Sequence, residues 1–259
     1  MEQWEMVDEG WGRRAVEFAT LAEPSNCREY VFLHERLDIG TGDRVLDVAC
    51  GSGLAIELAA TRGARCAGID ASARLVAVAR DRTPDADIRV GDMGALPWAD
   101  ETFDVVTSFR GIWGTTPQAV EEARRVLAPG GRLSFTCWGN VRKSPGAWMF
   151  VPFLWATDTK VDHQADMVSL GFPGVGEAFL SDRGFDVDER FEVPFFFEYA
   201  DPDVYARAMA ATGPGYEAIE DIGEDEFMAR AVELAAEHVR DGLPLRGRIE
   251  LFGYVGTKR

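Results

Sequence analysis

The sequence predicts an α/β fold: a doubly wound, mostly parallel sheet of seven strands with a terminal antiparallel hairpin. Short apolar and β-branched runs alternate with segments of helical periodicity between residues 42 and 138, a pattern typical of βαβ units. Glycine-rich turns follow several of these runs. The chain has 259 residues, 46% of them hydrophobic and 11% aromatic, so it can bury its core as a single domain over 1–259.

The N-terminal region is predicted to be helical. Trp11, Ala15 and Phe18 recur at the spacing that places side chains on one face of a helix. Residues 29–37 repeat that spacing. We therefore expect helices over 11–18 and 29–37, ahead of the first strand.

Strands alternate with helices through the middle of the chain. Ser72 is a suitable N-cap for one helix, and Pro117 suits the first turn of another. Strands are expected over 44–49, 65–70, 87–91, 103–109 and 132–138, and helices over 54–61, 73–80 and 117–127. Right-handed crossovers place the carboxyl ends of such strands along one edge of the sheet, where ligands bind in doubly wound folds.

The second half of the chain is less regular. Its expected elements are an aromatic stretch over 148–155, a turn over 171–176, a short helix over 177–182, a strand over 185–199, helices within 201–240 that break at 213–215 and near Gly223, and a strand over 248–257. The two long strands would form the antiparallel hairpin. Helical insertions over 140–181 and 201–242 would then lie on either side of the strand at 185–199.

The charge balance argues against a nucleic-acid partner. The chain carries 27 Lys and Arg against 44 Asp and Glu, a formal net charge of −17, and has no basic cluster. Proteins that bind nucleic acids usually present a basic patch. We interpret the excess of acid as a contribution to solubility.

Other features predict a cytoplasmic protein. No apolar run reaches the roughly 18–20 residues that a membrane helix needs. The first ten residues are acidic and lack the apolar segment of a signal peptide. The cysteines, which are Cys27, Cys50, Cys66 and Cys137, show no paired spacing. We therefore expect reduced thiols, with neither a disulfide framework nor a metal site.

The strongest motif is the glycine-rich turn that follows the strand at 44–49. Its candidate ligand-binding residues are Asp47, Ala49, Cys50, Gly51 and Gly53. Glycines allow positive φ angles and let a ligand approach the backbone closely. The turn lacks the dinucleotide fingerprint G-x-G-x-x-G, because residue 56 is isoleucine.

Acidic residues end the next two strands and sharpen this prediction. Asp70 closes the strand at 65–70, where a carboxylate can accept hydrogen bonds from both hydroxyls of a ribose. Asp92 and Met93 follow the third strand and could contact an adenine amine and ring. Taken singly, each aspartate could equally be a helix cap or a turn former. As a spaced set they favour a nucleoside ligand.

These residues resemble the motifs of class I S-adenosylmethionine-dependent methyltransferases. The similarity extends to the branch that includes ubiquinone, menaquinone and small-metabolite enzymes. It lies within 42–138 and is carried by residues 45–53, 68–72, 91–93, 96–97, 103–106 and 122–133. It implies a Rossmann-like fold, S-adenosyl-L-methionine as cofactor and S-adenosyl-L-homocysteine as product.

The resemblance also implies roles for individual residues. Asp47 and the turn from Ala49 and Cys50 through Gly51 to Gly53 would hold the methionine part of the cofactor, with Phe109 nearby. Asp70, with Ala71 beside it, would bind the ribose, and Asp92 with Met93 would frame the adenine. Ala49 replaces the first glycine of the commonest version of the motif. Residues 1–40 would form a helical lid, with Trp11 against the ligand.

Candidates for the acceptor side are fewer. Tryptophans near the expected ligand edge could line an apolar pocket; they are Trp11, Trp113, Trp148 and Trp155. Among three histidines, His163 is the one we single out as a candidate base, because its segment resembles the part that covers the substrate in this family. The alternative for His163 is an ordinary structural histidine.

The sequence thus predicts methyl transfer to an O, N or C atom of a small aromatic or lipophilic molecule. A different enzyme on the same fold, catalysing a cyclisation or decarboxylation, is the first alternative. A protein methyltransferase and a non-enzymatic binding module are others. The N-terminal helices and the insertions could support a homodimer.

Overall fold

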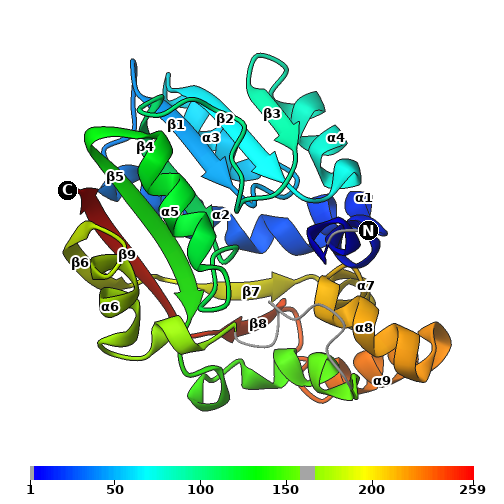
Figure 1. Cartoon of the computed structure of the whole chain (residues 1–259). Coiled ribbons are helices and arrows are strands. Elements are labelled where there is room, and N and C mark those ends of the chain that lie inside the picture. The colour runs from blue at the N-terminus through cyan, green and yellow to red at the C-terminus, as the bar shows by residue number, and fades with distance from the viewer. Residues whose placement is uncertain (1–2, 158–166) are drawn as a thin grey trace.

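A computed structural model describes residues 3–157 and 167–259 of the chain (Figure 1). A seven-stranded sheet of order β3-β2-β1-β4-β5-β9-β6 forms its centre. Its strands are β1 (Arg44–Val48), β2 (Arg65–Asp70), β3 (Asp87–Val90), β4 (Phe103–Phe109), β5 (Leu127–Trp138), β6 (Phe185–Glu192) and β9 (Leu251–Lys258). The first five strands are parallel, and β9 runs antiparallel to both β5 and β6. The predicted fold class is confirmed.

Helices pack on both faces of the sheet. They are α2 (Cys27–Arg36), α3 (Leu54–Thr61) and α4 (Ala73–Arg82) on one side, and α5 (Pro117–Val126) and α6 (Val175–Ser181) on the other. Adjacent residues of β1 reach opposite cores, since Val45 belongs to the same buried cluster as Leu33 of α2, while Leu46 belongs to the cluster that includes Val120 of α5. Alternation along a strand therefore builds two hydrophobic layers from one buried sequence.

A second unit lies beyond the carboxyl ends of the parallel strands. It contains the hairpin of β7 (Phe196–Tyr199) and β8 (Leu245–Arg248), the helices α7 (Pro202–Ala210), α8 (Gly213–Ile222) and α9 (Glu224–Ala236), and the 3-10 helix η6 (Ala147–Trp155). Figure 1 shows the three helices grouped at the end of this hairpin. The unit thereby faces the sheet edge at which the ligand is predicted to bind.

The strand predicted over 185–199 is two strands in the structure. β6 pairs with β9, whereas β7 pairs with β8 in a separate sheet. Pro194 lies between them and has no N–H to donate, so it interrupts the ladder. β5 also differs from expectation, since it begins at Leu127 and passes through a register shift opposite β4.

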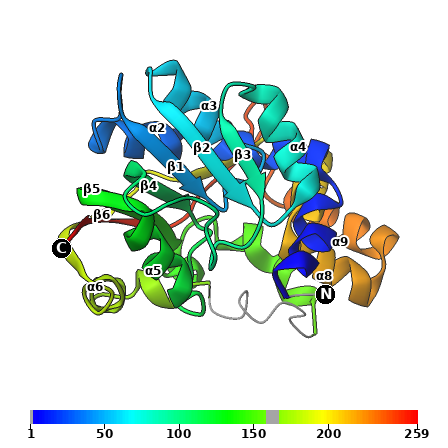
Figure 2. The same ribbon diagram turned by 45° about the horizontal axis from the view of Figure 1, so that its top comes forward.

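The N-terminal segment is less regular than the predicted helices. It begins with η1 (Gln3–Met6), η2 (Asp8–Gly12) and α1 (Ala15–Glu17), and continues through η3 (Phe18–Ala22) and η4 (Glu23–Asn26) into α2. Figure 2 shows these turns beside α4 and α8. The chain therefore passes over the carboxyl ends of the parallel strands before it enters the core.

The glycine turn after β1 is held by close packing between two helices. Gly53 has φ +81° and precedes α3. A Cβ placed there would lie 2.6 Å from the Cβ of Ala79 in α4. Only glycine meets both constraints, because other residues are strained at this φ and would clash with α4.

We expect Gly53→Ala to lower the free energy of unfolding by about 2–4 kcal/mol, as backbone strain and overpacking add. Gly42→Ala is the matched control. Gly42 also has a positive φ of +100°, but a Cβ added there would meet no heavy atom within 4 Å beyond its chain neighbours. Urea denaturation measures both, and equal losses in the two variants would contradict the packing argument.

Candidate functional site

A cavity of about 460 Å³ lies at the carboxyl ends of β1, β2, β3 and β4. Its walls come from the strand ends, the N-terminal segment and the second unit. The predicted cofactor residues that line it are Asp47, Ala49, Cys50, Gly51, Asp70, Ala71, Asp92, Met93 and Phe109. Gly53 is not in the lining and instead caps α3. The fold thus gathers residues from the ends of four strands, β1 to β4, around one space of ligand size.

The turn after β1 is conformationally strained. Ala49 has φ +58° and Gly51 has φ +55°. A non-glycine residue in this region costs about 1–2 kcal/mol. A Cβ on Gly111, just beyond β4, would lie only 2.3 Å from the Cβ of Ala49. The loops after β1 and β4 therefore touch at the cavity wall, and their close approach requires glycine at 111.

Asp70 links the glycine turn to the start of α4. Its carboxylate accepts hydrogen bonds of 2.8 Å from the backbone N–H of Gly51 and the backbone N–H of Ser72. Burial raises the pKa of Asp70, the two backbone N–H groups oppose that rise, and nearby Asp8 and Glu23 add to it. Carboxylate oxygens have further lone pairs, so Asp70 can still accept from a ligand.

Asp47 lies deeper, at the end of β1. It is buried and accepts a hydrogen bond of 2.8 Å from the hydroxyl of Thr107 on β4. Burial raises the pKa of Asp47 to about 8; Thr107 opposes this, and the charges of Asp70, Glu23 and Glu29 add to it. The carboxyl is poised to ionise when a positive group arrives nearby.

Glu23 also lines the cavity, although no sequence pattern predicted it. Its buried carboxylate accepts hydrogen bonds from the Ser52 hydroxyl, from Arg82 and from the backbone N–H of Leu54. Burial raises its pKa, with Ser52 and Arg82 opposing. Arg82 also donates to the carbonyl of Ala19 at 3.0 Å. No local pattern marks Glu23, because its partners lie in distant parts of the chain.

The strand-end half of the cavity is strongly acidic. Asp47, Asp70, Asp92 and Glu23 all contribute to its lining. Among the described lining residues Arg110 is the one cationic side chain, and it forms an ion pair with Glu29. Carboxylates that share a partly desolvated space favour a positively charged ligand.

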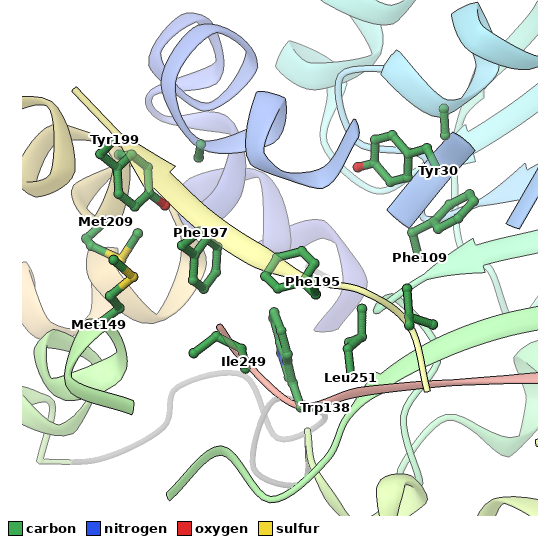
Figure 3. Packing of buried hydrophobic residues seen from close by; sticks show 14 of the residues in the cluster. Tyr30, Phe109, Trp138, Met149, Phe195, Phe197, Tyr199, Met209, Ile249 and Leu251 are labelled. Carbon is green, nitrogen blue, oxygen red and sulfur yellow. The ribbon is translucent and has the colours of Figure 1, made fainter. Parts of the chain in front are cut away.

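The other half of the cavity is aromatic. Its lining includes Trp138, Phe150, Phe153, Phe197 and Tyr199. Figure 3 shows Phe195 just before β7, Phe197 and Tyr199 along the β7 ribbon, and Trp138 beside Phe195. Trp138 contacts Phe195 edge-on, with ring centroids 5.2 Å apart. Phe197 thus packs against Trp138 and also faces the cavity.

The four tryptophans predicted for the acceptor side divide into two pairs. Trp11 and Trp113 line the cavity. Trp148 and Trp155 do not: Trp148 stacks on His238 at 4.0 Å, and Trp155 meets Phe227 edge-on at 5.4 Å. Both belong to η6, which packs against α8 and α9 and whose Phe150 and Phe153 do line the cavity. The structure therefore does not bring these two tryptophans to the cavity, where the sequence had placed them.

The histidines contribute nothing to the described lining. His163 lies outside the described residues. His34 is buried in α2, and burial lowers its pKa to about 4, with Arg62 adding to the effect. His238 stacks on a tryptophan away from the cavity.

The N-terminal segment covers the cavity and is tied down by charge. Trp4, Val7 and Trp11 line the space. Asp8 accepts hydrogen bonds from the Ser72 hydroxyl and from Nε of Arg74, the latter at 2.8 Å, at the start of α4. An acidic side chain is stabilised at a helix N-terminus. The interaction places the predicted lid residues over the strand ends.

Residues 3–157 and 167–259 contain neither a membrane-spanning helix nor a metal-binding cluster. In these stretches no helix is both long and apolar enough to cross a lipid bilayer. The same stretches hold no cluster of three or more His, Cys, Asp or Glu side chains arranged to bind a metal ion. All four cysteines are free thiols.

Residues 46–135 match a family model described as a methyltransferase domain. A demethylmenaquinone methyltransferase from Renibacterium salmoninarum is 42% identical over 115 residues, which make up 44% of this chain and 48% of that protein. The match therefore spans about half the length of this curated relative. These findings confirm the resemblance that the motifs within 42–138 carry.

Solved structures share the fold at low sequence identity. The [4+2]-cyclase SpnF has a TM-score of 0.55 and 22% identity, over 90% of this chain and 80% of that chain. A geranyl diphosphate C-methyltransferase from Streptomyces coelicolor A3(2), solved with Mg²⁺, geranyl-S-thiolodiphosphate and S-adenosyl-L-homocysteine, has a TM-score of 0.54 and 16% identity, over 89% and 75%. Likeness at this level shows the fold alone.

The raised pKa of Asp47 predicts a pH dependence of stability. Between about pH 4 and pH 8 the folded protein keeps a proton on Asp47 that the unfolded chain releases. The free energy of unfolding therefore falls as pH rises through this window, by up to about 1.4 kcal/mol per pH unit. Asp47→Asn keeps the bond from Thr107 and has no proton to lose. We expect its stability relative to the wild type to increase from pH 5 to pH 8.

Denaturant unfolding at several pH values measures this difference. Asp87→Asn is the control, because Asp87 is exposed and its pKa is lowered, chiefly by the side chain of Arg89. Its difference from the wild type should stay flat over the same range. A flat difference for Asp47→Asn as well would show that Asp47 is ionised in the folded protein.

Proposed function

We propose that this chain transfers a methyl group from S-adenosyl-L-methionine to a small-molecule acceptor; the match of residues 46–135 to a methyltransferase-domain model and the similarity to a demethylmenaquinone methyltransferase support this. The observation that carries the proposal is the division of one cavity into an acidic half and an aromatic half. The first half suits a cationic nucleoside, and the second suits a flat or lipophilic molecule. Both would be enclosed in the same space.

The acidic half fits the cofactor by its charge and its backbone. S-adenosylmethionine carries a sulfonium and an ammonium group against one carboxylate, so it is a net cation. Asp47 and the strained turn at Ala49 and Gly51 would hold its methionine part. Asp70 would accept from the ribose hydroxyls, and Asp92 would accept from the adenine amine. The buried acids would gain a positive partner on binding.

The cofactor supplies an activated methyl group, so the protein has to provide position and enclosure. Holding two reactants in line contributes about 7–11 kcal/mol towards lowering a barrier. The aromatic walls and the N-terminal residues Trp4, Val7 and Trp11 would exclude water from the space. The acceptor that this arrangement favours is aromatic or lipophilic, with an O, N or C atom as nucleophile.

The cofactor assignment makes a prediction for Asp70. Hydrogen bonds to a charged group contribute about 1.5–3 kcal/mol, so Asp70→Asn should weaken binding about 10- to 100-fold. Calorimetric titration with S-adenosylmethionine and S-adenosylhomocysteine measures the change. Asp87→Asn, an exposed site outside the lining, is the matched control and should bind like the wild type. Unchanged affinity in Asp70→Asn would reject its role, and no binding by folded wild type would reject the cofactor.

The reaction type has its own test. The wild type is incubated with S-adenosylmethionine and a panel of flat aromatic and lipophilic compounds, and the products are analysed by mass spectrometry. We expect a product heavier than its substrate by one CH₂ group, and its loss in the Asp70→Asn variant. A product of unchanged mass, or one that has lost CO₂, would support cyclisation or decarboxylation instead. Methyl label on macromolecules alone would support a protein methyltransferase.

A further inference from the structure

We propose that Arg110 binds an anionic oxygen of the acceptor, so that the acceptor is a flat apolar molecule bearing an acidic hydroxyl or a carboxyl group. This inference rests on the proposed function, since it concerns the second ligand of the same cavity. It is carried by the placement of the guanidinium, by the way that group is anchored, and by the lack of competing cations in the described lining.

The first observation is the direction in which Arg110 extends. The residue directly follows β4 and has φ +61°, a left-handed conformation that costs a non-glycine residue about 1–2 kcal/mol. Its guanidinium carbon lies 4.9 Å from the ring centroid of Trp138 and 5.1 Å from that of Phe195. The positive charge therefore lies among the aromatic residues of the acceptor half.

The second observation is that one edge of the guanidinium is anchored and another is left over. Nε lies 3.1 Å from Oε2 of Glu29, and Nη2 lies 2.9 Å from the same oxygen. Glu29 is fully buried in α2 and also accepts from the Thr136 hydroxyl. Within 3–157 and 167–259, no atom accepts a hydrogen bond from Nη1. A planar guanidinium held on one edge presents its other donors in a fixed direction.

The third observation concerns charge in this half of the cavity. Arg110 is the one Lys or Arg among the described lining residues, so it is the cationic side chain that an anion bound there would contact. Its field reaches phenols in the wall. Burial raises the pKa of Tyr30, the charges of Glu23 and Glu29 add to the rise, and the charge of Arg110 opposes it. Burial also raises the pKa of Tyr199, where a hydrogen bond with Ser25 and the charge of Arg110 oppose the rise. A phenol or carboxylic acid of a bound acceptor would experience the same field.

The rings around Arg110 strengthen this effect. Aromatic walls exclude water, and charges attract each other more strongly in such surroundings. Glu29 prevents the guanidinium from swinging away, so it positions Arg110 and does not contact the acceptor. The acidic groups of the lining belong to the strand-end half, where they would repel an anion. An acceptor would therefore enter with its acidic oxygen towards Arg110.

The test uses 4-nitrophenol, whose ionised form absorbs at a longer wavelength than its neutral form. The protein is first saturated with S-adenosylhomocysteine, which fills the cofactor half without the charge of a sulfonium. The absorbance of the bound probe is then followed against pH. An opposite charge within about 4–6 Å lowers the pKa of an acid by about 1–3, and we expect such a fall for the probe on the wild type.

Arg110→Gln should abolish that fall while leaving the affinity for S-adenosylhomocysteine unchanged. Arg230→Gln is the matched control, because Arg230 is an exposed residue of α9 that pairs with Glu226. Since Arg110→Gln leaves Glu29 buried without its partner, the double variant Arg110→Gln with Glu29→Gln is measured beside it. The double variant removes both charges and keeps an acceptor for Thr136.

The outcomes separate the two proposals. If the wild type does not bind S-adenosylhomocysteine, the proposed function fails. If the wild type binds S-adenosylhomocysteine but 4-nitrophenol ionises as in water, the inference about Arg110 is overturned and the proposed function stands. The same conclusion follows if both Arg110 variants keep the lowered pKa of the probe. If the Arg110 variants instead lose affinity for S-adenosylhomocysteine, Arg110 belongs to the cofactor half, and the inference is again overturned.

Discussion

The carboxylate of Asp70 accepts one hydrogen bond from the glycine turn after β1 and another from the first turn of α4, and much of the cavity depends on this bridge. It holds two chain segments that meet only because β1 and β2 are neighbouring parallel strands. Gly53 completes the arrangement, since its lack of a side chain lets α3 approach Ala79 of α4. The strained turn can persist because both sides are fixed.

The gathering of buried acids at this edge is a second consequence of the topology. Asp47 and Asp70 come from adjacent strands, and the N-terminal segment adds Glu23 to them. Burial disfavours their charged forms and raises all three pKa values. Stability of the folded chain is lowered by such a cluster, and a cationic ligand would offset that cost. These residues thus favour ligand binding at a cost to the stability of the ligand-free protein.

The second unit contributes the aromatic wall of the cavity, which lies opposite the acidic strand ends. Pro194 separates β6, which pairs with β9, from β7, which pairs with β8. The hairpin of β7 and β8 carries Phe197 and Tyr199 to the space beyond the parallel strands. The guanidinium of Arg110 lies against the rings of Trp138 and Phe195 and is held by Glu29. A polar anchor within an apolar wall orients a ligand, whereas the rings alone would only enclose it.

The sequence by itself determined the parallel core and the acidic residues at its strand ends. Strand periodicity, glycine turns and the spacing of Asp47 and Asp70 are local patterns, and local patterns can be read along a chain. Only the tertiary structure decided the rest of the site. It brought Glu23 beside the glycine turn and turned Trp148 away from the cavity onto His238. It also paired Arg110 with a glutamate distant in sequence. These placements depend on contacts between segments far apart in the chain, which no local periodicity encodes.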